Sequence, residues 1–519
     1  MSLGLESAGF ELYFANELSP MASETFAYNL LQEDLDNLSK HNLLPKKSIW
    51  IKSAFPKDQL KNRLRENPFE GKNGKYSDLD SSIDLKEKLL IGDIDELLLW
   101  LNKNPGIVSK IKKENITLLS GGPPCQSFSL AGRREKNNAK NLLPLSFAKF
   151  AGLIQPQFVI LENVKGITSA FTEEGKKHFA WFEVAKAFAL EGFVPICMLL
   201  NSKYFGVAQN RERFILLALR HNIAKKLFNK RKDSRLQEAL NFYSVVNKNK
   251  GNLERISLAL LRYYDIETYP SLYNGLLFPI ISTPEGQFVS AAEAIGDLKN
   301  TTGKILYSKS RVIYRDYLNS IFPSPFHEGK NIIYNHEPRI HNYDVKARFR
   351  LYQIMNEFQN GNKKAATEAL LGNILKGEEL IKLAKEIAGY DIYIRNGEAS
   401  EYYKKLTAPA DVERYIKSIS TRKHSQRALK EYEPAPAQLT IPDDVCHYDM
   451  SQLRTLTVRE MARFQSFPDW FVFKSKTTTG GNNRKFEVPQ YTQVGNAVPP
   501  LLAKSLGETI KKILEEIAN

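Results

Sequence analysis

Cys125 differs from an ordinary free cysteine because of the loop that carries it. The segment LLSGGPPCQSFS places it just after an apolar run, behind two glycines and two prolines. Most free cysteines are small buried core residues, and a core position does not need a loop stiffened by two prolines. A thiolate acts as a nucleophile in a partly exposed setting that is electropositive or rich in hydrogen-bond donors. The loop therefore favours a nucleophilic role for Cys125.

A carboxylate and two guanidinium groups lie next to other apolar runs. Glu162 follows the apolar residues of FVILENVKG, so its carboxyl lies at the rim of the core and could donate a proton or a strong hydrogen bond. The alternatives are a helix N-cap or an ion pair. In GVAQNRERF, Arg211 and Arg213 fall on one side of a strand, where both could reach one polar ligand. The alternative for this pair is a solvated surface.

These residues require a framework, and the pattern from residue 10 to about 220 supplies one. Short apolar runs alternate there with helical stretches, which indicates βα units around a parallel sheet. We expect strands at 11–16, 89–91, 116–119, 158–161 and 214–219. Glu17, Asp93, Cys125 and Glu162 each come soon after one of the first four. Ligands of open α/β sheets bind beyond the carboxyl ends of the strands, so we expect the site at that edge.

The rest of the chain divides into further parts. Residues 36–88 are polar and predict an insertion on the sheet, whereas 221–450 mix aromatic-rich and helical segments and indicate a separate domain. In 451–519, Thr457 and Glu460 have the spacing of a capping box. Four residues of the final segment predict one apolar helix face: Leu502, Leu506, Ile510 and Ile513. The predicted domains are therefore 1–220, 221–450 and a return to the first domain in 451–519.

Composition narrows the class of protein. The chain has 519 residues, 73 Lys and Arg against 58 Asp and Glu, a net charge of +15 and three cysteines. Three cysteines argue against a disulfide framework and favour the cytoplasm, and no apolar run is long enough to span a bilayer. The charge favours a nucleic-acid partner, the alternative being an ordinary basic protein. No metal site is expected, because Pro338 breaks the helix that a zinc motif at His336 and His341 would need.

Taken together, the segments resemble the DNA cytosine-5 methyltransferase family. GGPPCQSFS is similar to the Pro-Cys loop of that family, LENVKG to its Glu-Asn-Val motif and GVAQNRERF to its Gln-x-Arg-x-Arg motif. RTLTVREMARFQSFPDWF is similar to the segment after its recognition domain, and YTQVGNAVPPLLA to its closing motif. The resemblance implies an α/β, Rossmann-like, S-adenosylmethionine-dependent methyltransferase domain. The inserted, mixed target-recognition domain would be 221–450.

The resemblance also implies roles for individual residues. Cys125 would add to C6 of a flipped cytosine, Glu162 would hold the N3 edge, and Arg211 and Arg213 would contact the base or its loop. No metal would be required. The cofactor would meet Glu17 at its ribose and Asp93 and Ile94 at its adenine. The remaining predicted cofactor contacts are Pro124, Leu143, Asn496 and Val498, and the predicted DNA contacts near the base are Gln126, Ser127 and Gln209.

Two segments of the recognition region combine basic residues with aromatic or amide ones, as phosphate and base-edge contacts do. They are YNHEPRIHNYDVKARFR and STRKHSQR. The DNA contacts predicted from them are Arg339, Arg348, Arg350, Arg422, Lys423 and Arg427. Ordinary exposed basic residues are the alternative for each.

The implied function is methylation of C5 of cytosine in a specific double-stranded DNA sequence. The enzyme would be the modification partner of a restriction endonuclease in a bacterial cytoplasm, near the nucleoid, and a monomer. One departure is that the chain opens with MSLGLESAGF, without the FxGxG turn of the family. We expect Met1 to be an internal methionine of a longer reading frame. The alternatives are a non-catalytic sequence-specific DNA-binding protein and an RNA cytosine-5 methyltransferase, although 221–450 lacks the Cys-Phe-Thr triplet of the RNA-acting relatives.

Overall fold

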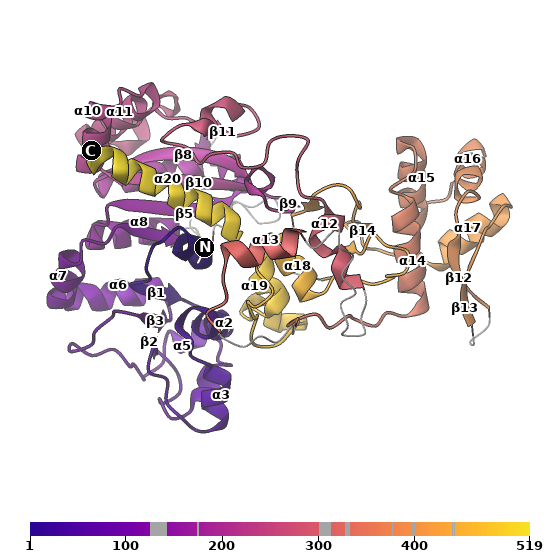
Figure 1. Ribbon diagram of the computed structural model, residues 1–519, viewed down its shortest axis with the longest axis horizontal. Helices are drawn as coiled ribbons and strands as arrows, with labels where there is room; N and C mark the ends of the chain where they lie inside the picture. The colour runs from indigo at the N-terminus through magenta and orange to yellow at the C-terminus, as the bar shows by residue number, and fades with distance from the viewer. Residues whose placement is uncertain are drawn as a thin grey trace. The chain divides into compact units, whose positions relative to one another are not determined.

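The structure is a computed structural model that describes residues 1–124, 143–173, 176–299, 313–326, 333–375, 377–396, 400–437, 440 and 442–518. The chain forms two compact units (Figure 1). Unit 1 consists of Met1–Gln287, Lys474–Pro489 and Ala497–Asn519, and unit 2 of Phe288–Phe473 and Gln490–Asn496. Residues 221–287, which were predicted to belong to the recognition domain, pack in unit 1.

Two sheets form the framework of unit 1. The first is parallel with the order β1-β3-β2, from β1 (Phe14–Glu17), β3 (Lys88–Ile91) and β2 (Ser48–Trp50). The second has the order β11-β8-β10-β5-β4, from β4 (Leu118–Gly121), β5 (Phe158–Val164), β8 (Phe193–Asn201), β10 (Glu212–Arg220) and β11 (Tyr263–Asp265). Strands β4 and β5 run parallel, and β10 runs antiparallel to β5 and β8. All five expected strands are present, with shifted ends. β2, β8 and β11 were not predicted.

Helices surround these sheets in unit 1. They are α1 (Ser2–Ser7), α2 (Pro20–Leu31), α3 (Leu35–Lys40), α4 (Leu60–Arg63), α5 (Pro68–Gly71), α6 (Ile94–Lys103), α7 (Pro105–Lys113), α8 (Leu143–Ile154), α9 (Ala180–Leu190), α10 (His221–Lys230), α11 (Ser234–Lys248) and α20 (Pro500–Ala518). Short strands β6 (Ala170–Glu173), β7 (Lys176–Phe179) and β9 (Gln209–Asn210) complete the unit. Within the described residues, no helix is long and apolar enough to cross a membrane.

The core of unit 1 explains why its central strands are apolar on both faces. Leu161 of β5 and Leu216 of β10 lie in one cluster with Phe147 of α8, Phe188 of α9 and Phe242 of α11, and all are almost fully buried. A strand covered by helices on both faces has no solvent side, so its sequence is apolar throughout instead of alternating. The residues that follow β4 are attached to this packed sheet through the pairing of β4 with β5.

Helices α1 and α20, from opposite ends of the chain, pack closely. A Cβ atom on Gly4 would lie 2.1 Å from the carbonyl oxygen of Pro500, and one on Gly507 would lie 2.8 Å from the Cβ of Ala8. Glycine is therefore required at both positions for this approach. The predicted apolar face of α20 is confirmed, because its four residues are buried: Leu502, Leu506, Ile510 and Ile513.

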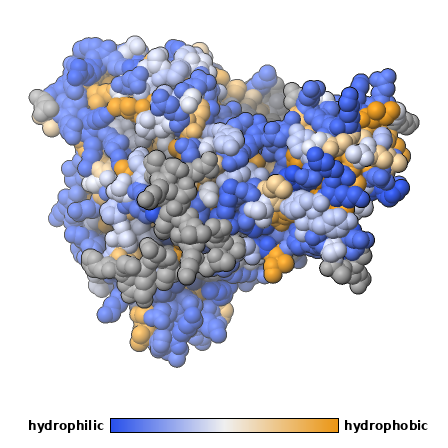
Figure 2. All heavy atoms as spheres, turned by 45° about the vertical axis from the view of Figure 1, so that its right-hand side comes forward, coloured by the Kyte–Doolittle hydropathy of each residue, from blue (hydrophilic) through white to orange (hydrophobic). Residues whose placement is uncertain are grey.

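Unit 2 is mainly helical. Its helices are α12 (Ala291–Ile295), α13 (Ile313–Ile321), α14 (Tyr343–Ile354), α15 (Asn360–Leu370), α16 (Glu378–Ile387), α17 (Pro409–Ser418), α18 (Val458–Phe464) and α19 (Gln490–Asn496). A hairpin joins β12 (Ile392–Asn396) to β13 (Ser400–Lys404), and the short strands are β14 (Arg427–Ala428), β15 (Ala435–Pro436) and β16 (Val445–Cys446). Hydrophilic residues make up most of the molecular face shown in Figure 2, in keeping with the 25% of charged residues in the chain.

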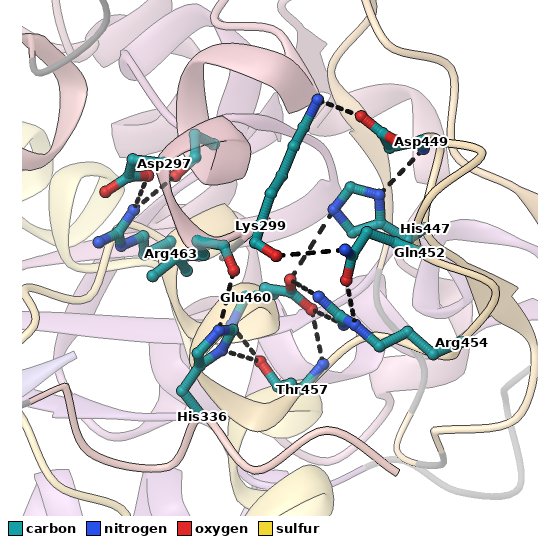
Figure 3. A network of polar contacts seen from close by, with 12 residues as sticks. Asp297, Lys299, His336, His447, Asp449, Gln452, Arg454, Thr457, Glu460 and Arg463 are labelled. Carbon is teal, nitrogen blue, oxygen red and sulfur yellow. Dashed lines mark hydrogen bonds and ion pairs between the residues drawn. The ribbon is translucent and has the colours of Figure 1, made fainter. Parts of the chain in front are cut away.

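A buried polar network surrounds the N-terminus of α18 (Figure 3). The predicted capping box is confirmed: Thr457 Oγ1 accepts from Glu460 N at 3.2 Å, and Glu460 Oε2 accepts from Thr457 N at 2.8 Å. Arg454 donates to both Glu460 oxygens, at 2.8 and 2.7 Å. Arg459 donates to the carbonyls of Tyr334, Pro468 and Phe471, and Arg463 pairs with Asp297 and Asp469. Unit 2 is therefore held together by charged groups as well as by apolar packing.

His447 makes the stability of this network depend on pH. The side chain is fully buried, its Nδ1 accepts from Asp449 N at 3.0 Å, and burial lowers its pKa to about 4. Between pH 6.5 and pH 4 the unfolded chain therefore binds a proton that the folded chain excludes. We expect acidification from pH 8 to pH 5 to cost about 2 kcal/mol of unfolding free energy through this residue alone.

Urea unfolding at several pH values tests this expectation. The variant His447→Asn keeps an acceptor for Asp449 N but no longer titrates, so it should lose less stability on acidification than the natural chain. His424 is exposed, and His424→Asn serves as the control, which should leave the pH dependence unchanged. If His447→Asn shows the same pH dependence as the natural chain, the assignment to His447 is wrong.

Candidate active site

Glu162 and Arg213 form a buried pair between two neighbouring strands. Glu162 on β5 lies opposite Ile215 of β10, and Arg213 lies two residues earlier in β10, on the same face. Arg213 Nε is 2.8 Å from Glu162 Oε1, and both side chains are about one-tenth exposed. Burial lowers the pKa of Arg213, and the Glu162 carboxylate opposes this effect. The pair thus presents a fixed carboxylate with one oxygen engaged by a cation.

The stem of the predicted nucleophile loop is attached to the same strand. Asn163 Nδ2 donates to the carbonyl of Pro123 at 2.9 Å, two residues before Cys125. A Cβ atom on Gly122 would lie 2.9 Å from Glu162 Oε2, so a side chain at this position would have to displace the carboxylate. Cys125, Gln126 and Ser127 lie outside the described residues. The described part of the loop therefore leads from β4 past the Glu162 carboxylate.

Gln209 and Arg211 precede Arg213 in the sequence. Both side chains are buried, but their hydrogen bonds differ. Arg211 is 1% exposed, its Nη2 donates to the carbonyl of Ala497 at 3.0 Å, and burial lowers its pKa. Gln209 is 0% exposed, and among the described residues its Oε1 and Nε2 have no hydrogen-bond partner. A buried amide with an unfilled donor and acceptor is costly, so this side chain needs an explanation beyond packing.

Two carboxylates lie at the ends of neighbouring parallel strands in the first sheet. Glu17 ends β1 opposite Ile91 of β3, and Gly92 N donates to the carbonyl of Glu17 at 2.9 Å. Glu17 Oε1 accepts from Ser19 N at 2.8 Å, and burial raises the pKa of Glu17. Asp93 Oδ1 caps α6 by accepting from Asp95 N at 2.8 Å. Since Ile94 is the first residue of α6, the structure brings Glu17, Asp93 and Ile94 together at one edge.

A small pocket lies beside Asp93. Its walls include Leu18, Trp50 and Pro68 as apolar surfaces and Lys72 and Asp93 as polar groups. The ribose hydroxyls and the exocyclic amine of adenosine are hydrogen-bond donors that carboxylate oxygens accept, and its base needs apolar walls. The edge formed by Glu17, Asp93 and Leu18 therefore offers carboxylate acceptors and an apolar side chain, the kinds of groups that an adenosine-containing cofactor needs.

The other predicted cofactor contacts have different surroundings. Pro124 and Leu143 border residues 125–142 on either side, and Val498 belongs to unit 1 and is 6% exposed. Asn496 ends α19 in unit 2. Among the residues that the structure describes, no group of three or more His, Cys, Asp or Glu side chains could hold a metal ion.

The basic residues predicted to contact DNA fall into an exposed set and an engaged set. Arg422 and Arg427 are exposed, and Arg339 and Lys423 both pair with Asp443, at 2.7 and 3.3 Å. A shared carboxylate between two exposed cations is easily exchanged for a phosphate, because surface pairs are worth only about 0–1 kcal/mol.

Arg348 and Arg350 on α14 are engaged inside unit 2. Arg348 Nη1 donates to the carbonyl of Ile419 at 3.1 Å, and Arg350 Nε donates to that of Asp391 at 2.7 Å. Arg350 is 9% exposed. A guanidinium that is buried against a backbone carbonyl is not accessible to a phosphate in this conformation.

Sequence reasoning missed three residues of this region. Asn163 follows Glu162 directly and fixes the neighbouring loop through Pro123. The signal in the sequence was an amide side chain near the end of a predicted strand. Gly122 precedes the two prolines, and its role becomes visible only through its distance to Glu162. Lys72 lies in the polar stretch 36–88, where nothing in the sequence separates it from other exposed lysines.

Comparison with known proteins assigns the family. The family described as C-5 cytosine-specific DNA methylase matches residues 86–272 and 295–512. The chain belongs to this family. The enzyme is therefore a DNA cytosine-5 methyltransferase, which confirms the predicted family and the Rossmann-like α/β fold class with an inserted mixed domain. The family assignment favours this activity over the RNA methyltransferase and the non-catalytic DNA-binding protein.

The individual relatives share about a quarter of their residues with this DNA methylase. It is 25% identical over 414 residues to the type II methyltransferase M.DdeI of Desulfomicrobium norvegicum, a match that covers 79% of this chain and 75% of the relative. It is 25% identical over 411 residues to M1.HphI of Haemophilus parahaemolyticus, covering 78% and 71%. The crystal structure of the S. pombe Dnmt2 methyltransferase matches with 14% identity and a TM-score of 0.33, over 83% of this chain and 84% of that one.

Proposed function

We propose that this enzyme transfers a methyl group from S-adenosylmethionine to C5 of a cytosine flipped out of a specific double-stranded DNA sequence. It would act as the modification enzyme of a restriction–modification system, in the bacterial cytoplasm where its DNA substrate lies. The observation that carries the proposal is the Glu162–Arg213 pair at the stem of the Cys125 loop. The type II relatives support the pairing with a restriction endonuclease of the same site.

In the proposed mechanism, the residues of this chain activate the cytosine. The Cys125 thiolate forms a bond to C6, while Glu162 holds the N3 edge and favours protonation of N3, which neutralises the negative charge that develops on the ring. C5 then becomes nucleophilic enough to accept a methyl group. After transfer, the C5 proton passes to solvent and the electron pair of the C5–H bond re-forms the C5=C6 double bond, which expels the Cys125 thiolate. The N3 proton returns to Glu162, and 5-methylcytosine is left. Arg213 holds Glu162 in place throughout.

The cofactor site in this proposal is the edge formed by Glu17 and Asp93. S-adenosylmethionine, when bound, supplies an electrophilic methyl group on its sulfonium. Glu17 would accept from the ribose hydroxyls, and Asp93 and the backbone of Ile94 would bind the adenine edge. Pro124, Leu143, Asn496 and Val498 complete the proposed contacts.

DNA recognition is assigned to the region of residues 221–450. Arg339, Arg422, Lys423 and Arg427 are exposed and would contact phosphates or base edges. Gln209 would use its unpaired amide near the flipped base, together with Gln126 and Ser127 of the loop. A flipped base exposes its Watson–Crick edge, which an amide can bind with one donor and one acceptor.

A covalent-adduct experiment tests this function. DNA of many sequences that carries 5-fluorocytosine should be trapped as a stable protein–DNA adduct in the presence of S-adenosylmethionine, because fluorine cannot leave C5 as the proton does. Cys125→Ser should abolish the adduct. Cys197→Ala is the matched control, because this thiol is fully buried and burial raises its pKa. No adduct with the natural chain, or an adduct that survives Cys125→Ser, would overturn the proposal.

A further inference from the structure

Lys72 reaches the cofactor edge from the polar stretch 36–88, which was predicted as an insertion. Its Nζ donates to Asp93 Oδ2 at 3.1 Å, and both residues line the cavity beside Gly92. Asp93 Oδ1 is already used to cap α6. The Asp93 carboxylate is therefore held at both oxygens, by its own helix on one side and by Lys72 on the other.

The segment that carries Lys72 is itself fixed. Ser53 and Tyr76 pair through two backbone hydrogen bonds, of 2.8 and 3.2 Å, which close the segment between them. Inside it, Glu66 Oε2 accepts from Ser53 Oγ at 2.9 Å and from Ala54 N at 3.1 Å. Gly71 packs so closely on Glu66 that a Cβ atom would lie 3.1 Å from its carboxyl carbon. These contacts fix the turn that carries Lys72, and so they place its side-chain amine next to Asp93.

A buried ion pair anchors this turn to the sheet. Arg63 Nη1 is 2.7 Å from Asp78 Oδ2, and their side chains are 1% and 5% exposed. The same Asp78 oxygen accepts from the backbone N of Trp50 on β2 at 3.0 Å. Strand β2 pairs with β3, which ends just before Asp93. The turn and Asp93 are therefore connected through neighbouring strands of one sheet.

The surroundings of Lys72 favour its protonated, positively charged form. Burial works to lower the pKa of Lys72, but the hydrogen bond to Asp93 and the charges of Asp95 and Glu96 outweigh it, so its pKa is raised. The amine remains protonated at neutral pH and donates hydrogen bonds only. It therefore cannot accept from the exocyclic amine of adenine, and it leaves the free lone pairs of Asp93 for that purpose.

We propose that Lys72 is a positioning residue for the cofactor, which holds Asp93 so that its remaining lone pairs accept from the adenine amine. This inference rests on the proposed assignment of Asp93 to adenine. A carboxylate oxygen has about two acceptor sites, so Asp93 Oδ2 can serve Lys72 and the ligand together. Without Lys72 the carboxylate would lose one of its two restraints and bind adenine less tightly.

Calorimetry with S-adenosylhomocysteine and the purified full chain tests the inference. We expect Lys72→Met to weaken binding about tenfold, and Lys72→Arg, which keeps a donor, to recover most of it. Lys40→Met is the matched control, because Lys40 lies in the same polar stretch but pairs with Asp36 at 2.6 Å and does not line the cavity. It should change the affinity less than twofold. In steady-state assays Lys72→Met should raise KM for S-adenosylmethionine and leave kcat unchanged.

A double-mutant comparison separates action through Asp93 from a general structural effect. If Lys72 acts through Asp93, Lys72→Met should have no further effect in an Asp93→Asn background. If the natural chain binds no S-adenosylhomocysteine, or Asp93→Asn leaves the affinity unchanged, the proposed cofactor site fails. If Asp93→Asn weakens binding but Lys72→Met does not, or if the two effects add, only the inference about Lys72 fails.

Discussion

Replacing Glu162 with Gln is expected to lower kcat for methyl transfer by about 10²- to 10⁴-fold, the usual contribution of a proton-transferring group. Gln has the size of Glu and can still accept from Arg213 through its carbonyl oxygen. It cannot donate an acidic proton to N3 of cytosine. The loss should therefore appear in catalysis and not in cofactor affinity, because Glu17 and Asp93 belong to the other sheet of unit 1.

Transfer of a radioactive methyl group to DNA measures kcat, and calorimetry with S-adenosylhomocysteine measures the affinity for the cofactor. Glu212→Gln is the matched control. Glu212 is next to Arg213 but pairs with the exposed amine of Lys165, at 2.6 Å. The kcat of the Glu212→Gln variant should therefore stay within about twofold of that of the natural chain. A Glu162→Gln enzyme with more than a third of the natural kcat would contradict the proposed role of Glu162.

Replacing Arg454 with Met is expected to cost about 3–5 kcal/mol of unfolding free energy, the usual effect of removing one partner of a buried ion pair. Glu460 is 0% exposed and accepts from Arg454 through both oxygens. The hydrogen bonds and charge of Arg454 outweigh the effect of burial and lower the pKa of Glu460 to about 2. Without Arg454 the folded state must bury a carboxylate that has lost its main partner.

Urea unfolding at pH 7 measures this loss. The double variant Arg454→Met/Glu460→Gln should recover part of the stability, because it removes the unpaired charge as well. Lys430→Met is the control, since the Lys430–Glu433 pair is exposed on both sides and its loss should cost less than about 1 kcal/mol. A cost below 1 kcal/mol for Arg454→Met would show that the pair contributes little.

The sequence predicts those parts of the molecule whose cause is local. The apolar runs of β5 and β10 and the capping box of Thr457 and Glu460 each follow from residues that are neighbours along the chain. Strand β8 was not predicted, since Pro195 interrupts its apolar run, and β2 has only three residues. The position of Glu162 at the edge of the sheet followed from its strand, whereas its pairing with Arg213 required the register of β5 and β10.

Long-range contacts account for the rest. Arg350 lies in a basic and aromatic segment, which is why it was predicted to face DNA, yet it donates to a carbonyl 41 positions away in the chain. Lys72 meets Asp93 across 21 positions. The periodicity of a sequence predicts helices and strands, but it does not indicate which distant residues will form a hydrogen bond.

The discontinuity of unit 1 has a consequence for folding during synthesis. The chain leaves this unit after Gln287 and returns at Lys474, where Lys474 N donates to Thr25 Oγ1 at 2.8 Å, and α20 then packs on α1. A ribosome that adds about 5–20 residues per second needs roughly 10–40 s for the intervening stretch. During that time the surface of α1 that Gly4 presents to α20 is uncovered. Helix α1 must therefore be kept from other partners until α20 has been synthesised.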